Sequence, residues 1–424
     1  MRAIRTSAQA AVGALPAGRT IVSGPGCATP TTLLRALGEL ADRGRGWTLE
    51  SALLLGDLPF VDAVREGRLA HTTWHVVAGT RELVADGYAD FIPLRGSEVP
   101  ARLERRPGGA AFVRVSPPGP DGQVSLGTSV GFTRTAIATA AVVIGEVDPG
   151  MPRTHGESLV PVEAFAALVD SEDPTPEYAS AEADDVTRRI SEHLLDLLPK
   201  DPVLQMGIGG VPEALTGMLV GADLGAVRLL GLGTDPMIDL FDAGVLHTSD
   251  VVPSPAVMAV ELMGTRRMLD FVDDQPAVGV YPVGHAGDPR ALARIPRLVS
   301  VLTALEVDLW GQVNLEQVAG RQITGLGGSL DFNEGARGSD GGVRIVALRA
   351  TARGRSRIVS RLGRGTPVTL GRHAVDHVVT EYGVASIGGL SLRERAEALI
   401  AIAAPEHRDE LAAVDEVAMT SEGA

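Results

Sequence analysis

Several residue types and segments are scarce in this 424-residue chain, and each scarcity excludes a class of function. Cys27 is the only cysteine, which excludes intrachain disulfides and every zinc or iron–sulfur site built from several cysteines. Lys200 is the only lysine. It falls in an expected helix-to-strand turn, so it is a poor candidate for the buried lysine of a Schiff-base enzyme. No Gly-Lys-Ser/Thr sequence is present, which excludes a P-loop.

Positive charge is also in short supply. The chain has 38 Lys and Arg residues against 53 Asp and Glu residues, a net charge of −15. This balance argues against a nucleic-acid binder, but an anionic small ligand needs only local dipoles and a few arginines. No apolar run is long enough to span a membrane, and the N-terminal segment lacks the leucine-rich centre of a signal peptide. We therefore expect a cytoplasmic protein that binds neither nucleic acid nor membranes.

The chain does contain a regular alternation of β-branched and helix-like segments. We expect strands at 110–116, 141–148, 343–350 and 375–382, and helices at 184–198 and 391–404. Ser391 and Glu394 form a capping box at the start of the last helix. The alternation predicts an α/β fold with mostly parallel sheets. The Pro-rich and acidic stretch 171–185 predicts the linker, which gives domains at 1–183 and 184–424.

Two stretches of the chain have a similar order of signals. Residues 20–34, "TIVSGPGCATPTTLL", contain an apolar strand, a Gly-x-Gly turn and a proline that opens a helix. Residues 203–215, "VLQMGIGGVPEAL", have the same order. Pro30 and Pro212 would lie in first helical turns, where proline is tolerated. The repetition predicts two similar, open α/β domains that face each other across a cleft.

The turn 207–211 is the first candidate ligand site. Its glycines allow backbone N–H groups to approach a ligand, and the following helix N-terminus favours an anion. A tight strand–helix turn without a ligand is the alternative. The turn is not a dinucleotide fingerprint, because the third glycine is misplaced and Pro212 interrupts the pattern.

Three further patterns lie in the C-terminal half. Seven glycines in residues 325–342 argue against a plain strand or helix, so this segment is either a mobile loop or backbone lying against something bulky. Six arginines in residues 349–365 alternate as in a strand and either contact phosphates or form a solvated face. His373 and His377 would lie about 13 Å apart on one strand face, which argues against a metal site.

Several motifs taken together resemble the acetyl-CoA hydrolase/transferase family, which includes the 4-hydroxybutyrate and butyrate:acetate CoA-transferases. They cover nearly the whole chain in order: "VSPPGPDGQVSLGTSV", "MPRTHGES", "QMGIGGVPEAL", "VDLWGQVNLEQ", "GLGGSLDF", "VVTEYGVA" and "LRERAEALIAIAAPEHRDEL". The resemblance implies an enzyme that uses coenzyme A as substrate and product and binds it between two α/β domains. We also expect no metal, and a homodimer. The residues it implies for the CoA site are Gly207, Ile208, Gly209, Gly210, Val211, Gly325, Gly327, Gly328, Arg349, Thr351 and Arg353.

The resemblance also raises a question about the nucleophile. Transferases of the family use a glutamate that forms an acyl-glutamyl anhydride and then a glutamyl-CoA thioester. In the preferred alignment of "GLGTDPMIDL", that position falls on Gly231 and Asp235 is a structural or general-base carboxylate. A rival alignment makes Asp235 a shortened nucleophile. Other departures are Ser329 in place of a glutamine, Ala350 before Thr351, and Leu302 in place of an asparagine.

These observations predict an enzyme that cleaves or transfers at an acyl-CoA thioester without the family's covalent glutamate. Asp235 is the candidate catalytic residue, and Glu316 or Glu261 would be the acid recruited if a covalent adduct did form. Two alternatives stay open: an acyltransferase acting on a small acceptor that is not a carboxylate, and a non-catalytic CoA-binding homologue. A Rossmann dehydrogenase is disfavoured by the glycine spacing.

Overall fold

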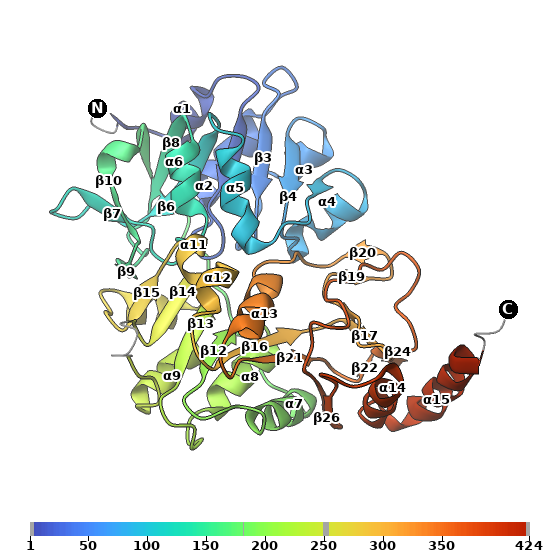
Figure 1. Cartoon of the computed structure of the whole chain (residues 1–424). Helices are drawn as coiled ribbons and strands as arrows, with labels where there is room; N and C mark the ends of the chain where they lie inside the picture. Colours follow the sequence, from blue (N-terminus) through green and yellow to red (C-terminus); the bar gives the residue numbers. More distant parts are fainter. Residues whose placement is uncertain (1–3, 181, 249–253, 421–424) are drawn as a thin grey trace.

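The structure is a computed structural model that describes residues 4–180, 182–248 and 254–420. It has two α/β lobes, one from each half of the chain (Figure 1). In the described residues, the first lobe has an eight-stranded sheet in which every pairing is parallel. Its strand order is β1 (Ile4–Arg5), β11 (Ala167–Asp170), β8 (Val142–Val147), β6 (Ala110–Val115), β2 (Thr20–Ser23), β3 (Thr48–Ser51), β4 (Ala70–Thr73) and β5 (Asp90–Phe91).

Helices cover both faces of this first sheet, which is why its central strands are buried on both sides. In β6, Ala110 and Phe112 pack with one set of helices, whereas Ala111 and Val113 join the core on the opposite face. The helices are α1 (Ala8–Gly13), α2 (Thr31–Leu40), α3 (Val61–Arg65), α4 (Arg81–Ala85), α5 (Val99–Glu104) and α6 (Thr133–Thr139). A small antiparallel pair, β7 (Gln123–Ser125) with β10 (Leu159–Pro161), and the short 3₁₀ helices η1 (Ala78–Thr80), η2 (Gly96–Glu98) and η3 (Val162–Ala164) complete this part.

The second lobe has a nine-stranded sheet in the described residues, parallel except for the pairing at one edge. Its order is β26 (Gly383–Ser386), β25 (His377–Thr380), β21 (Val343–Ala347), β16 (Leu298–Thr303), β12 (Val203–Met206), β13 (Arg228–Gly233), β14 (Val257–Leu262), β15 (Val278–Val280) and β9 (His155–Gly156). Strand β9 belongs to the first half of the sequence but pairs with β15 of the second lobe. The two halves of the chain are therefore joined by strand pairing as well as by packing.

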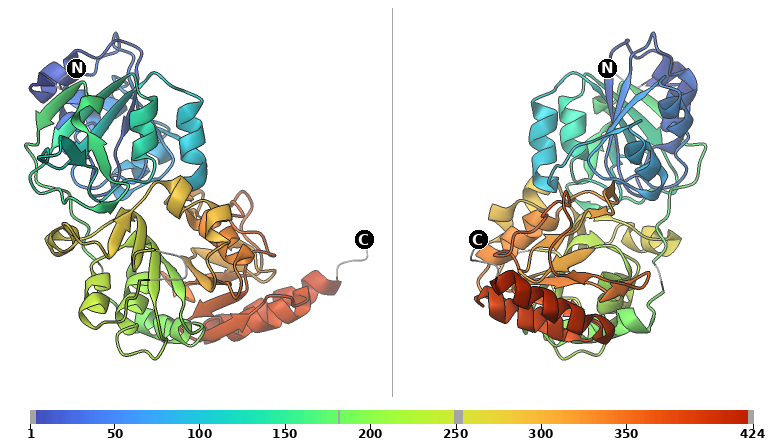
Figure 2. Two further views of the ribbon diagram at one scale, coloured as in Figure 1. Left: turned by 60° about the vertical axis from the view of Figure 1, so that its left-hand side comes forward. Right: turned by 90° about the vertical axis from the view of Figure 1, so that its right-hand side faces the viewer.

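The helices of the second lobe lie on both faces of its sheet and at its far end (Figure 1). They are α7 (Asp185–Leu195), α8 (Gly210–Met218), α9 (Pro236–Asp242), α10 (Arg266–Val272), α11 (Val283–Ala286), α12 (Pro289–Leu292), α13 (Ser329–Gly338), α14 (Leu392–Ala401) and α15 (Pro405–Thr420). Short strands form a three-stranded sheet and two hairpins: β17 (Glu306–Asp308) with β18 (Val313–Asn314) and β24 (Ile358–Val359), β19 (Gln317–Val318) with β20 (Arg321–Gln322), and β22 (Thr351–Ala352) with β23 (Arg355–Ser356). Helix α15 runs outward from the lobe (Figure 2).

The two lobes share one strand order, which confirms the expected pair of similar α/β domains. The run β8-β6-β2-β3-β4-β5 of the first sheet corresponds to β21-β16-β12-β13-β14-β15 of the second. The glycine turns 24–29 and 207–211 follow the equivalent central strands β2 and β12. The expected strands and helices lie within a few residues of the observed ones, and the Ser391–Glu394 capping box is present.

Two local expectations are wrong. The glycine-rich segment 325–342 contains a ten-residue helix, α13, because its glycines permit close packing rather than irregular backbone. A Cβ on Gly335 would overlap Leu292, and one on Gly338 would lie 2.7 Å from the Ala293 Cβ, so these glycines let α13 approach α12. The arginine-rich segment 349–365 is not one strand face. It turns at Arg353, which has a φ of 53°, to form the β22–β23 hairpin.

Candidate functional site

A cavity of about 300 Å³ lies where the two lobes meet. It is bounded by the carboxyl-terminal ends of β3, β4, β12, β13, β14 and β16, and by residues from segments 94–99, 129–132 and 326–332. Ligands of open parallel sheets bind beyond the carboxyl ends of the strands, where side chains and loops converge. The cavity therefore has the location expected of an active site shared by two facing α/β domains.

Glu261, near the end of β14, is an acidic side chain in the wall of this cavity. The Ser129 hydroxyl donates a hydrogen bond of 3.2 Å to its Oε1. The backbones of Ser129 and Glu261 also form an antiparallel bridge, and the Leu262 N–H donates to the Thr128 carbonyl at 2.8 Å. The first lobe therefore fixes both the backbone and the carboxyl group of Glu261.

Burial raises the pKa of Glu261 to about 7, and the hydrogen bond from Ser129 acts in the opposite direction. At this pKa the side chain passes between carboxylic acid and carboxylate close to neutral pH. Strongly perturbed carboxyl groups in cavities are typical of nucleophiles and general bases. In electrostatic terms, Glu261 can act as either.

The turn 24–29 of the first lobe lies directly against the Glu261 carboxyl group. Gly26 has a φ of 61°, and a Cβ built on it would overlap Glu261 Oε1. The Thr29 hydroxyl donates to the Gly26 carbonyl at 2.7 Å, and the Leu55 N–H donates to the same hydroxyl oxygen at 3.0 Å. Glycine is required at position 26 both by the backbone conformation and by the approach of the carboxyl group.

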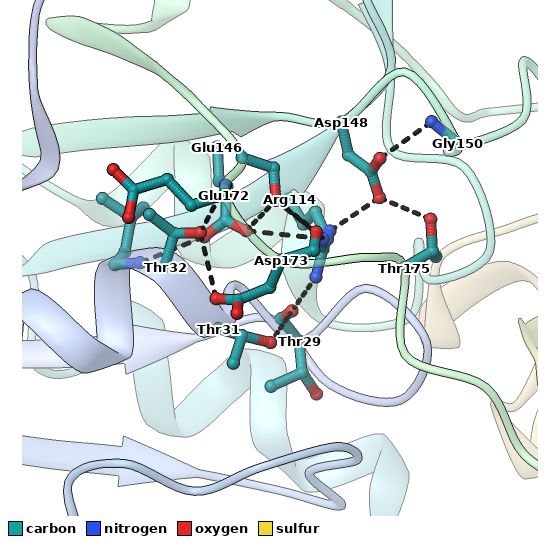
Figure 3. Close-up of polar contacts among 12 residues, drawn as sticks. Thr29, Thr31, Thr32, Arg114, Glu146, Asp148, Gly150, Glu172, Asp173 and Thr175 are labelled. Atoms are coloured by element: carbon teal, nitrogen blue, oxygen red, sulfur yellow. Dashed lines mark hydrogen bonds and ion pairs between the residues drawn. The ribbon is translucent and has the colours of Figure 1, made fainter.

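A buried ionic network anchors this turn from behind (Figure 3). Arg114, which is fully buried, donates to the Thr29 carbonyl at 3.0 Å. Its guanidinium also pairs with Asp148 at 2.8 Å and lies 3.6 Å from Glu146. Burial raises the pKa of Glu146 even though Arg114 opposes that shift. The network holds one end of the turn that contacts Glu261.

The same network binds the start of the segment that leads to the second lobe (Figure 3). Arg114 donates to the Ser171 hydroxyl at 2.8 Å and to the Asp173 carbonyl at 2.5 Å. The Thr175 hydroxyl donates to Asp148 at 2.5 Å. No helix or strand is assigned to residues 171–180 or 182–184, which connect the two lobes.

The glycine turn 207–211 only partly faces the cavity. Gly207 and Ile208 line it, whereas Gly209, Gly210 and Val211, at the start of α8, do not. Gly209 has a φ of 110°, and a Cβ there would have nothing within 4 Å, so the space beside it is open. Its N–H donates to Glu213 Oε1 at 3.1 Å.

Glu213 links this turn to the inter-lobe segment. Besides Gly209, its Oε1 accepts a hydrogen bond of 2.9 Å from the Tyr178 hydroxyl. Burial is the main cause of an upward shift in the pKa of Tyr178, with the nearby Glu213 adding to it. Glu213 therefore holds the turn on one side, and the space beside Gly209 is open on the other.

The second glycine cluster lies against the first lobe. Gly327 and Gly328 line the cavity, whereas a Cβ on Gly325 would overlap the Trp74 carbonyl. Asp331, in the first turn of α13, accepts hydrogen bonds from Arg95 at 2.9 Å and from the Ser97 hydroxyl at 2.7 Å. These contacts cross between the lobes. Gly325 allows the two lobes to pack closely, and Asp331 links them through hydrogen bonds.

The three polar residues expected near the ligand lie outside the wall of this cavity. Arg349 pairs with Asp184 at 2.9 Å, Thr351 is part of the β22–β23 hairpin, and Arg353 is at its turn. None of the three lines the cavity. Arg349 and Arg353 therefore do not meet the glycines in the cavity wall.

Asp235 and Gly231 also lie apart from the cavity wall. The Asp235 carboxylate accepts the N–H of Thr265 at 3.2 Å and sits at the start of α9. Gly231 lies within β13 with a φ of 96°, and a Cβ there would lie 3.2 Å from the Phe332 ring and 3.3 Å from the Met206 carbonyl. A side chain at position 231 would therefore be in tight contact with the Phe332 ring and would strain the positive φ.

The strand register explains which carboxyl group reaches the cavity instead. After an irregularity at Gly231 and Leu232, β13 pairs with β14 so that Leu232 lies beside Glu261. The acid therefore comes from the neighbouring strand. A signal was present in the sequence, since "VMAVELMG" contains one acid in an otherwise apolar strand, but the function of that acid depends on the other lobe.

Two negative findings concern the described residues alone. They contain no group of three or more His, Cys, Asp or Glu side chains that could hold a metal ion. No helix among them has the length and apolar character needed to cross a membrane.

Comparison with known proteins agrees with this arrangement. The chain belongs to the acetyl-CoA hydrolase/transferase family: residues 6–193 match the model of its N-terminal domain and residues 264–414 that of its C-terminal domain. It is thus an enzyme of the CoA-transferase or acyl-CoA hydrolase type. Asp235, Glu261 and the turn 207–211 fall between the two matched segments.

Individual relatives sharpen the comparison. The chain is 35% identical over 391 residues to 4-hydroxybutyrate coenzyme A transferase of Clostridium kluyveri, covering 90% of each chain. It is 34% identical to succinyl-CoA:cyclohexane-1-carboxylate CoA transferase of Geobacter metallireducens, covering 80% of this chain and 78% of the relative. The crystal structure of RipA from Yersinia pestis superposes with a TM-score of 0.90 at 28% identity, covering 98% of each chain.

Proposed function

We infer that this enzyme exchanges coenzyme A between an acyl-CoA thioester and a free carboxylate, with Glu261 as the nucleophile. The observation that carries this proposal is the place of the Glu261 carboxyl group, in the wall of a cavity bounded by the turns after β2 and β12 and 3.2 Å from the Ser129 hydroxyl. Burial, which raises the pKa of this group to about 7, supports it. The family contains both transferases and hydrolases, so the family alone does not choose between them. This proposal replaces our expectation of a reaction without a covalent glutamate.

The glycine backbones support binding of the thioester end of coenzyme A. Gly207 and Ile208 on one side and Gly327 and Gly328 on the other present backbone to the cavity. The N-terminus of α8 adds the positive end of its dipole next to Gly209. A cavity of about 300 Å³ holds only the acyl and thioester end of the ligand. Arg349, Thr351 and Arg353 thus remain predictions for the phosphate-bearing end.

The chemistry proceeds through two covalent states of Glu261. Its carboxylate attacks the thioester carbonyl, the carbon–sulfur bond breaks, and coenzyme A leaves as a thiolate from an acyl-glutamyl anhydride. The thiolate then attacks the glutamyl carbonyl carbon, which releases the first acyl group as a free carboxylate and leaves a glutamyl-CoA thioester. An acceptor carboxylate reverses these steps. Ser129 orients the Glu261 carboxyl group through its hydrogen bond of 3.2 Å.

Exchange between butyryl-CoA and acetate tests this assignment. Acetyl-CoA formation, followed by liquid chromatography and mass spectrometry, should fall by at least roughly 1,000-fold in Glu261→Gln. Asp235→Asn is the matched control, because the carboxylate it removes contacts Thr265 and does not line the cavity. It should retain most of the exchange activity.

Chemical capture distinguishes the remaining mechanisms. Borohydride added to enzyme incubated with butyryl-CoA should reduce the glutamyl-CoA thioester and modify Glu261. A modified Asp235 would support the rival alignment and overturn the assignment of Glu261. Acetate-independent release of coenzyme A without any adduct would identify a hydrolase that uses a general base. Binding without release would favour a non-catalytic homologue or an acceptor other than a carboxylate. The homodimer and the cytoplasmic location also remain predictions.

A further inference from the structure

The cavity around Glu261 has a mostly hydrocarbon wall contributed by both lobes. Its apolar side chains include Leu53, Trp74, Phe132, Val283, Leu302 and Phe332. Trp74 and Phe132 are buried and meet edge to face, with ring centroids 5.4 Å apart. Packing of this kind fixes the shape of the space next to the carboxyl group that we assign to the reaction.

The same wall carries no fixed positive charge. None of its lining residues, all within the described part of the chain, is a lysine or an arginine. His75 lines the cavity, but burial lowers its pKa to about 4, so its imidazole is neutral at physiological pH. Its Nε2 lies 3.1 Å from the Thr324 hydroxyl.

The charged groups of the wall are acids. Besides Glu261, the lining includes Asp331, whose carboxylate is bound by Arg95 at 2.9 Å and by Ser97. Arg95 also pairs with Glu334 at 2.8 Å, so its guanidinium is already engaged by two carboxylates. A second carboxylate on a substrate would enter an apolar space with acids at its edge and no cation to meet it. Burying an unpaired charge is strongly unfavourable.

We propose that this enzyme acts on monocarboxylic acyl groups with an uncharged hydrocarbon tail and rejects dicarboxylic ones. This inference rests on the proposed function, because it assumes that the acyl group reacts at Glu261. It goes beyond family membership, since relatives include an enzyme whose name pairs succinyl-CoA with a cyclic monocarboxylate. The choice between these classes lies in the cavity wall.

Donor selectivity tests the proposal on the whole enzyme. Butyryl-CoA and succinyl-CoA are supplied separately with acetate, and acetyl-CoA formation is measured for each. The ratio of kcat/KM should favour butyryl-CoA by about 1,000-fold or more, because the site offers no partner for the second carboxylate. Comparable values for the two donors would overturn the proposal. Exchange with neither donor, nor with cyclohexanecarboxyl-CoA, would instead reject the proposed function itself.

A charge-introducing variant provides a second test. Leu94 lines the cavity and is partly exposed, so Leu94→Arg places a cation in the wall. The kcat/KM for succinyl-CoA relative to butyryl-CoA should rise at least about tenfold in Leu94→Arg. The neutral control Leu94→Gln should leave that ratio near its original value. An equal change in both variants would contradict the charge argument. The donor comparison decides the matter if Leu94→Arg does not fold.

Discussion

The turns that follow β2 and β12 occupy equivalent positions in two similar sheets, yet their glycines serve different purposes. In the first turn, the space beside Gly26 is filled by the Glu261 carboxyl group. In the second, the space beside Gly209 is empty to 4 Å. The first turn thus packs against the carboxyl group that we propose as the nucleophile, whereas the second borders open space. Equivalent topology does not imply equivalent function.

The side chains that hold the two turns in place also differ. The first is anchored by the fully buried Arg114, which donates a hydrogen bond to the Thr29 carbonyl and pairs with the buried Glu146 and Asp148. The second is held by Glu213 through one backbone N–H and the Tyr178 hydroxyl. The first turn, beside the carboxyl group that we propose as the nucleophile, is thus held through a buried network of an arginine and two acids. The second turn is held through the single carboxylate of Glu213.

The largest expected effect comes from removing the anchor of the first turn. Arg114→Met leaves Glu146 and Asp148 buried without their cation, which should lower the free energy of unfolding by about 3–5 kcal/mol. Urea denaturation at pH 7 measures this change. Arg5→Met is the matched control, because the Arg5–Asp170 pair is exposed and should contribute no more than about 1 kcal/mol.

A double variant sharpens this test. Glu146→Gln removes one of the two acids left unpaired, so Arg114→Met with Glu146→Gln should be more stable than Arg114→Met alone. A loss below about 1 kcal/mol for Arg114→Met would show that the first turn does not depend on its ionic anchor.

The next effect is the pH dependence that Glu261 imposes. Its pKa of about 7 lies above the ordinary value of 4.5, so the folded state binds the proton more tightly than the unfolded state. Between these two values the folded protein holds more protons, and the free energy of unfolding falls as pH rises, by about 3 kcal/mol in all. Glu261→Gln should remove this part of the pH dependence, which urea titrations at several pH values would reveal.

Activity should show the opposite dependence over the same range. The carboxylate is the reactive form, so kcat/KM for butyryl-CoA should rise with pH and level off above about pH 7. A profile that levels off near the ordinary carboxyl pKa would mean that burial beside the turn 24–29 does not raise the pKa of Glu261.

The smallest of the three effects compares the glycines directly. Gly26→Ala places a Cβ against the Glu261 carboxyl group and should lower kcat by about 100-fold, because a displacement of the order of 1 Å suffices for such a loss. Gly209→Ala also strains a positive φ, but its Cβ meets open space. It should affect mainly the apparent affinity for coenzyme A. Equal kinetic defects in the two variants would remove the distinction between the two turns.

Local signals in the chain were enough to predict the main helices and strands and the repetition of one arrangement in two domains. Periodicity located α7 and β6, the Ser391–Glu394 pair located the start of α14, and the two Gly-x-Gly turns indicated similar domains. Local signals were misleading where glycine supports helix packing, as at Gly335 in α13. Glycine content alone does not distinguish a flexible loop from a close helix–helix contact, since the difference lies in the partner element.

By itself, therefore, the sequence determined two α/β domains, two glycine turns and a family resemblance, because each depends on residues that are neighbours in the chain. Only the tertiary structure decided which acid faces the cavity. The register between β13 and β14 sets Leu232 beside Glu261, and the first lobe brings Ser129 and Gly26 against that carboxyl group. The pKa near 7 arises from burial of Glu261 between the lobes, where its partner Ser129 is 132 residues away in sequence. Burial of this kind has no local signal in the chain.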